Sequence, residues 1–121
     1  MTSVCVRNQT RDTVLAHEAL WAKSYWTRLR GLLGRPEPKR GQGLILDPCK
    51  SVHMLGMRYA LDILFSDSQN RVVGLEAALA PWRLSSHHKC AAKVIELPVG
   101  TLQETGTCLG DQLVFTVMET P

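Results

Sequence analysis

The chain has 121 residues, 45% of them hydrophobic, and a formal net charge of +3 at neutral pH. This length and apolar content suit a single domain over residues 1–121 that needs neither disulfides nor metals to fold. No run approaches the roughly 18 apolar residues of a membrane span, and the first residues lack the apolar block of an export signal. We therefore expect a soluble, cytoplasmic protein without a membrane span.

The charge distribution bears on the class of partner, and the cysteine spacing bears on the redox state of the thiols. Residues 1–60 carry ten Lys and Arg against four Asp and Glu, whereas residues 61–121 carry four against seven. No aromatic and basic interleaving accompanies the basic half, so nucleic acid is an unlikely partner. The four cysteines are far apart in the sequence, and reduced thiols are expected in a domain of this size.

The N-terminal elements are predicted from changes in hydrophobic period. Apolar and β-branched residues at 4–7 and 13–21, separated by a polar break, indicate two strands joined by a turn. Apolar side chains then recur at helical spacing over 24–34, where Ser24 can cap the start and Gly34 can end the helix. A short strand at 43–46 ends at Asp47-Pro48, because Pro48 cannot donate a ladder hydrogen bond.

The remaining elements are mostly strands. A buried strand over 59–66, a turn at 67–70 and a returning strand over 71–76 make the strongest hairpin signal. Strands at 94–97 and 112–118 follow, and Thr101 and Glu104 have capping-box spacing over one helical turn at 101–105 that Gly106 ends. The predicted fold class is α+β, mainly β: a small antiparallel half-barrel or sandwich with the helix at 24–34 on one side.

Asp62 is the most unusual residue of the predicted strands. Its neighbours Leu61, Ile63 and Phe65 share one face of the strand and place Asp62 on the other, beside Leu64. A carboxylate at least half buried there needs a partner. Arg58, Arg28 or Arg30 could supply that partner, and backbone N–H groups are the other candidates. A structural role is favoured over a catalytic one.

Cys49 and His53 form the one candidate nucleophile and base pair. They lie four residues apart in an irregular segment that also contains Lys50, and a thiolate is the reactive form of cysteine. Short separation in sequence is weak evidence, because a cysteine after proline is commonly a small packed residue. Thiol catalysis by this pair is therefore kept as the alternative to a packing role.

A metal site would require His87, His88 and Cys90 to join Cys49 and His53. Zinc ligands usually come in pairs of two cysteines or two histidines at short spacing, and each half here mixes the two types. Exposed histidines in a polar loop are the favoured interpretation, so we predict no metal and no cofactor.

The order of several short motifs resembles a prokaryotic family known as domain of unknown function 192, over about residues 24–115. The motifs are Arg30-Gly31-Leu32-Leu33-Gly34-Arg35, Cys49 to Met57, Leu61-Asp62-Ile63-Leu64-Phe65, Ile95-Glu96-Leu97 and Gly110-Asp111. The chain is most similar to the branch with Ser51-Val52-His53 followed by Gly56-Met57-Arg58. The resemblance implies a compact, β-rich, bacterial protein with Met57, Arg58 and Asp62 at signature positions, and it implies no activity.

Two hypotheses for function follow from these observations. The first is a non-enzymatic binding or accessory module, in which Met57, Arg58 and Asp62 hold an unidentified small ligand or protein partner. The second is an enzyme that uses Cys49 with His53, oriented by Asp62 or Glu96.

Overall fold

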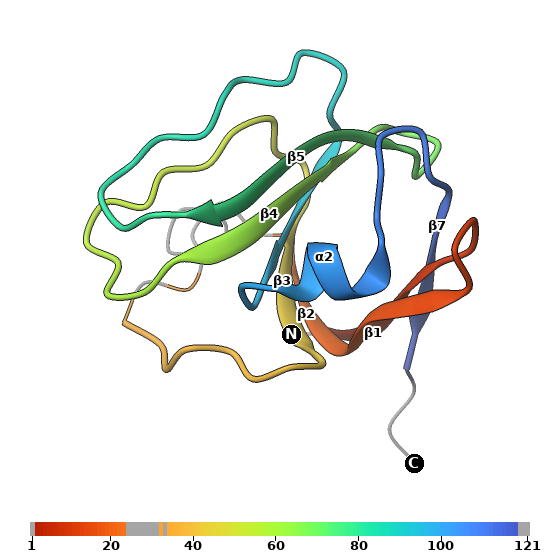
Figure 1. The fold of residues 1–121 in the computed structure, drawn as a ribbon, viewed down its shortest axis with the longest axis horizontal. Coiled ribbons are helices and arrows are strands. Elements are labelled where there is room, and N and C mark those ends of the chain that lie inside the picture. The colour runs from red at the N-terminus through yellow and green to blue at the C-terminus, as the bar shows by residue number, and fades with distance from the viewer. Residues whose placement is uncertain (1, 24–31, 33, 119–121) are drawn as a thin grey trace.

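The fold is built on seven strands that form one sheet in a computed structural model, which describes residues 2–23, 32 and 34–118. The strand order is β5-β4-β6-β3-β2-β1-β7 (Figure 1). The elements are β1 Thr2–Asn8, β2 Thr13–Ala22, β3 Gln42–Leu46, β4 Leu61–Ser66, β5 Val72–Leu79, β6 Lys93–Leu97, α2 Thr101–Thr105 and β7 Leu113–Val117. A mainly β, half-barrel fold is thereby confirmed.

The sheet curls until its two edge strands approach each other. A bridge joins Arg71, before β5, to Gln112, before β7, and the Leu113 N–H donates to the carbonyl of Asn70. All six residues of β4 are buried, because successive residues of a strand point to opposite sides and both faces of the sheet are covered here. The hairpins β1–β2 and β4–β5 arise where polar turns separate the apolar runs, as the sequence predicts.

One strand pair departs from the antiparallel prediction. β2 and β3 run parallel, with Ala19 opposite Gly43 and Ala22 opposite Leu46. A parallel pair needs a crossover of a dozen or more residues, and the connection from residue 23 to residue 41 is long enough. The helix predicted at 24–34 falls in this connection and lies outside the described residues except for Leu32 and Gly34.

The short helix α2 ends as predicted and begins differently. Gly106 closes it in the left-handed conformation, with φ of 66°. The capping box predicted for Thr101 and Glu104 is wrong, because Gly100 is the N-cap and no side chain caps the helix. The Thr101 hydroxyl instead donates to the carbonyl of Pro98, at 2.7 Å.

Apolar residues cover both faces of the sheet. Inside the curl, Leu64, Ile95 and Leu97 pack with residues of β1 and β2, and Leu102 of α2 covers this core. On the other face, Ile63, Phe65 and Leu44 pack beneath the irregular segment that carries Val52, Met54 and Met57. This second core positions the segment 49–59 and therefore the site described below. No helix within residues 2–23, 32 and 34–118 has the length and apolar character needed to cross a membrane.

Candidate functional site

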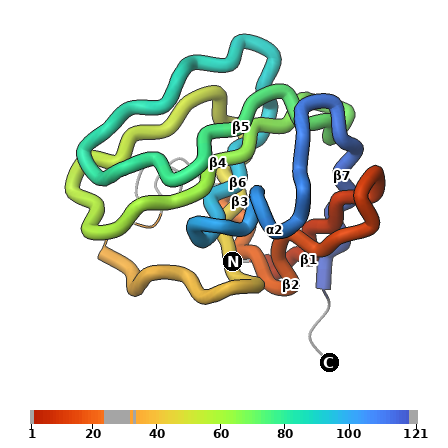
Figure 2. The backbone as a smooth tube through the Cα atoms, viewed as in Figure 1, coloured from red at the N-terminus to blue at the C-terminus, as the bar shows by residue number. Residues whose placement is uncertain are grey.

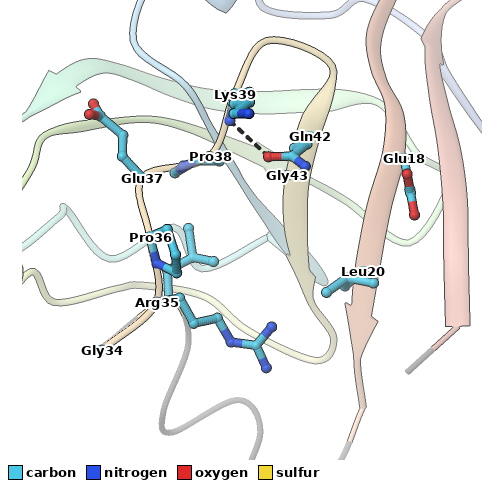
Figure 3. A pocket seen from close by; sticks show the side chains of 11 residues that line it. Glu18, Leu20, Gly34, Arg35, Pro36, Glu37, Pro38, Lys39, Gln42 and Gly43 are labelled. Carbon is cyan, nitrogen blue, oxygen red and sulfur yellow. Dashed lines mark hydrogen bonds between the residues drawn. The ribbon is translucent and has the colours of Figure 1, made fainter.

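Two clefts border the segment 34–37, which lies in the connection between β2 and β3. The first has a volume of about 710 Å³ and lies between this segment and strands β2 and β3 (Figure 3). The second has a volume of about 580 Å³ and lies between the same segment and residues 56–59. Both volumes are in the range of small-molecule sites. The second cleft contains Met57 and Arg58, two of the residues predicted to bind a ligand.

A tight turn places Met57 and Arg58 in different environments. The N–H of Met57 donates to the carbonyl of Met54 at 3.1 Å, and Gly56 supplies the left-handed conformation that the turn needs, with φ of 81°. Met57 is therefore buried in the second core, while Arg58 points its charge to solvent at the mouth of the cleft. Tyr59 follows and lines the same cleft.

Tyr59 ties the two walls of the second cleft together. Its hydroxyl donates to the carbonyl of Arg35 at 3.0 Å, with the carbonyls of Leu32 and Pro36 at 3.4 Å and 3.3 Å. Burial raises the pKa of this phenol first of all, and the carboxylates of Glu96 and Glu37 raise it further. The Tyr59 hydroxyl therefore stays protonated near neutral pH and holds the segment 34–37 against residues 56–59.

Arg35 brings a second cation to both clefts. Its side chain extends into the first cleft towards Leu20 of β2, while the carboxylate of Glu37 points away (Figure 3). The Nε of Arg35 is buried and has no hydrogen-bond partner among the described residues. A buried donor without an acceptor is costly unless a ligand supplies the acceptor. Arg35 and Arg58 thus line the second cleft together with the apolar residues Leu32, Pro36 and Met57.

Glu96 is a buried carboxyl group within electrostatic reach of Tyr59. It stands in β6 opposite Ile63 and Leu44 and is 4% exposed. Burial raises its pKa to about 7. Its Oε1 finds no hydrogen-bond partner within the described part of the chain. β3 and β6 approach each other closely at this point, and a Cβ on Gly43 would lie only 2.9 Å from the carbonyl oxygen of Glu96.

The structure places Asp62 away from the cleft lining. It is 1% exposed, and its burial is as the sequence predicts. Its Oδ1 accepts from the N–H of Ala78 at 2.9 Å, and its Oδ2 accepts from the N–H groups of Gly100 and Leu102 at 3.1 Å and 3.0 Å. Backbone groups are therefore the partners of this carboxylate. Asp62 anchors the start of α2 and the end of β5 to β4.

The candidate nucleophile Cys49 and the candidate base His53 are held by different contacts. The Cys49 thiol packs partly against the second core and donates to the carbonyl of Ser51 at 3.0 Å. His53 is exposed and pairs through its backbone with Leu84.

The residues considered for a metal site are dispersed. His88 stacks on Phe65, with ring centroids 3.9 Å apart, and its imidazole fills the space above Gly74. His87 and Cys90 are exposed. Over the described ranges, no group of three or more His, Cys, Asp or Glu side chains has the arrangement of a metal site.

Sequence reasoning missed Arg35 and Tyr59 as residues that line the second cleft, and it named Glu96 only as a residue that could orient the Cys49 and His53 pair. Glu96 carried the same signal as Asp62, since it is an acid between Ile95 and Leu97 in an apolar strand. Tyr59 directly follows the Met57-Arg58 block. No pattern in the sequence joins Arg35 to residues 56–59, because only the tertiary structure brings these segments together.

Comparison with known proteins places the chain in a family of uncharacterised function. Residues 6–115 match the model of DUF192, described as Uncharacterized ACR. A UPF0127 protein from Thermococcus sibiricus is 32% identical over 117 residues, which cover 93% of this chain and 75% of the relative. The UPF0127 protein PF1050 from Pyrococcus furiosus is 31% identical over 116 residues, which cover 92% and 97%. These relatives are archaeal and give no support to a bacterial source.

Two solved structures share the fold. A protein of unknown function from Novosphingobium aromaticivorans has a TM-score of 0.77 at 22% identity, over 93% of this chain and 83% of that one. A chain from Sinorhizobium meliloti, named as a candidate transcription regulator, has a TM-score of 0.81 at 21% identity, over 94% and 92%. Identities this low show the fold alone. The family model that matches residues 6–115 and the relatives at 31–32% identity establish that the chain belongs to the DUF192 family.

Proposed function

We propose that the chain is a non-enzymatic binding module whose ligand occupies the cleft between residues 34–37 and 56–59. The observation that carries this proposal is the meeting of Arg35, Met57 and Arg58 around a cleft of about 580 Å³. Two cations from segments far apart in the sequence line a concave surface that also has apolar walls. Pockets with apolar walls and a few convergent polar groups are the usual form of small-molecule sites.

The chemistry of the lining favours a ligand with an anionic group attached to an apolar portion. Arg58 is exposed at the mouth, and the buried Nε of Arg35 lacks an acceptor among the described residues. A carboxylate or phosphate oxygen supplies such an acceptor. Leu32, Pro36 and Met57 provide apolar surface for the remainder of the ligand. Asp62 contributes only indirectly, because three backbone N–H groups occupy its carboxylate.

The first test measures binding of octanoate, a carboxylate with an apolar tail, to the whole chain by titration calorimetry. The uncharged octanamide serves as the matched ligand. We expect octanoate to bind and Arg58→Gln to weaken its binding by about tenfold or more, as lost charge-assisted hydrogen bonds do. Arg35→Gln should weaken it similarly.

Lys39→Gln is the matched control, because Lys39 lines the first cleft but not the second. It should leave octanoate affinity unchanged. Equal affinity for octanoate and octanamide, or equal losses in all three variants, would show that the cations of the second cleft do not hold the carboxylate. The proposed ligand site would then be wrong.

The alternative thiol-dependent function is tested separately by alkylation of native protein across pH, read by mass spectrometry. In a binding module, Cys49 should react slowly, because its thiol donates to Ser51 and packs partly on the core. Fast modification of Cys49 well below the ordinary thiol pKa of about 8.5, slowed by His53→Ala, would favour the enzyme hypothesis instead.

A further inference from the structure

Two irregular segments, 48–60 and 80–92, form one end of the molecule. Figure 2 shows them running beside each other, and backbone hydrogen bonds join them. The N–H of Met54 donates to the carbonyl of Arg83, that of Ser85 to Val52, and that of His88 to Lys50, all at 2.8–2.9 Å. We call this surface the loop end. These hydrogen bonds hold the backbone of the two segments together.

Three large apolar side chains project from the loop end into solvent. Trp82 is 67% exposed, Leu84 is 68% exposed and Leu55 is 45% exposed. Trp82 also adopts a left-handed backbone conformation, with φ of 67°, which is unfavourable for a bulky residue. Its N–H donates to the carbonyl of Met54 at 2.8 Å, so this conformation is held in place. A strained, exposed tryptophan beside two exposed leucines indicates a binding surface.

The same two segments contain no carboxylate. Neither 48–60 nor 80–92 includes an Asp or Glu, although together they carry Lys50, Arg58, Arg83 and Lys89. Arg58, Arg83 and Lys89 are exposed. Glu76 lies at the border, where its carboxylate accepts weakly from the N–H of Ser86 at 3.3 Å. The loop end is therefore apolar at its tips and positively charged around them.

We propose that the loop end docks on an anionic membrane surface. Tryptophan prefers the interface between headgroups and acyl chains, and exposed leucines gain by entering the acyl region. Lysine and arginine beside them are attracted to anionic headgroups. A nucleic acid would use the cations and stack on Trp82, but it would leave Leu55 and Leu84 in water. The apolar side chains are 45–68% exposed to solvent, which fits insertion into a lipid surface better than the enclosed contacts of a peptide groove.

The experiment is co-sedimentation of the whole chain with vesicles of phosphatidylcholine alone and of phosphatidylcholine mixed with phosphatidylglycerol. We expect binding to the mixed vesicles and little to the neutral ones. Trp82→Ala and Leu84→Ala should each lower the partition coefficient by about tenfold, because each removes an apolar side chain that leaves water when the loop end enters the bilayer. Arg83→Glu should lower it by about fivefold or more and should weaken the dependence on salt.

Matched controls come from the opposite end of β5. Leu109 is 66% exposed and Arg71 is exposed there, so Leu109→Ala and Arg71→Glu remove comparable groups outside the loop end. Both should bind vesicles like the unmodified chain, and thermal melts check that every variant is folded. Absence of binding to the mixed vesicles would overturn the proposal. Losses of vesicle binding as large in Leu109→Ala and Arg71→Glu would also overturn it. So would complete displacement of the chain from vesicles by single-stranded DNA, if Leu84→Ala had no effect on vesicle binding.

Discussion

Asp62 and Glu96 are buried carboxylic acids on neighbouring strands, and their carboxyl groups differ in their hydrogen-bond partners. Asp62 in β4 receives three backbone N–H groups across its two oxygens. Glu96 in β6 has one oxygen without a hydrogen-bond partner among the described residues, and burial raises its pKa to about 7. The difference shows that burial alone does not define the role of an acid, since the partners decide it.

The partners of Asp62 are N–H groups that strand pairing leaves free. Gly100 and Leu102 lie at the start of α2, where backbone donors have no intrahelical acceptor, and Ala78 lies where the β4–β5 register shifts. Asp62 is therefore part of the framework. Glu96 faces the second core and Tyr59, and its spare oxygen is available for a proton at neutral pH. Replacing each acid by its amide isostere separates these two roles.

The largest expected effect is that of Asp62→Asn. The amide retains one acceptor oxygen, so at least one of the three N–H groups faces an NH2 group instead. We expect a loss of about 3 kcal/mol in the free energy of unfolding, measured by urea denaturation at pH 7, because buried donors are left unpaired. A loss below about 1 kcal/mol would contradict the framework role of Asp62.

At high pH, Glu96→Gln should raise the free energy of unfolding, whereas Asp62→Asn lowers it. Between about pH 4.5 and pH 7 the folded chain keeps a proton that the unfolded chain releases, so unfolding becomes easier as pH rises. Above pH 7 the ionised, buried carboxylate of Glu96 lowers the free energy of unfolding by its full amount, about 3 kcal/mol. The variant should therefore be more stable than the unmodified chain at pH 8 and similar at pH 4. Identical pH profiles of the two proteins would rule out a raised pKa at Glu96.

Asp111→Asn tests a third acid, which resembles Asp62 but lies nearer to solvent. Its Oδ2 accepts from Asn8, Arg11 and the N–H of Cys108 at 2.8–3.1 Å. Burial opposes ionisation, but the hydrogen bonds from Arg11, Asn8 and Cys108 outweigh it and lower the pKa of Asp111.

We expect Asp111→Asn to cost about 2 kcal/mol at pH 7, since the amide NH2 meets the guanidinium of Arg11. The lowered pKa stabilises the fold above the usual carboxyl pKa of 3.8, and this contribution is lost as pH falls further. The difference between the two proteins should therefore shrink in acid. A difference that stays constant from pH 7 to pH 2 would assign the cost to packing.

The smallest expected effect is that of Tyr59→Phe, which removes the hydroxyl that donates to the carbonyl of Arg35. A single hydrogen bond in a half-buried site contributes about 1 kcal/mol. The variant should lose that much stability, and residues 34–37 should exchange their amide hydrogens faster. Unchanged exchange would mean that Tyr59 does not hold the wall of the second cleft.

Most of the strands could be predicted from the sequence because their signals are local. Alternating apolar residues and polar turns define both hairpins, and the burial of Asp62 follows from its neighbours. The candidate site was predicted only in part. Met57 and Arg58 belong to a recognisable block, whereas Arg35 enters the same cleft from a segment about 20 residues earlier.

By itself, the sequence determined the mainly β class, the two hairpins, the end of α2 at Gly106 and the family to which the chain belongs. The tertiary structure alone decided that β2 and β3 run parallel, that Arg35 and Arg58 share a cleft, and that backbone N–H groups take up Asp62. Strand formation depends on neighbours one or two residues away. Strand order and the partners of buried charges depend on contacts between residues far apart, which no local pattern records.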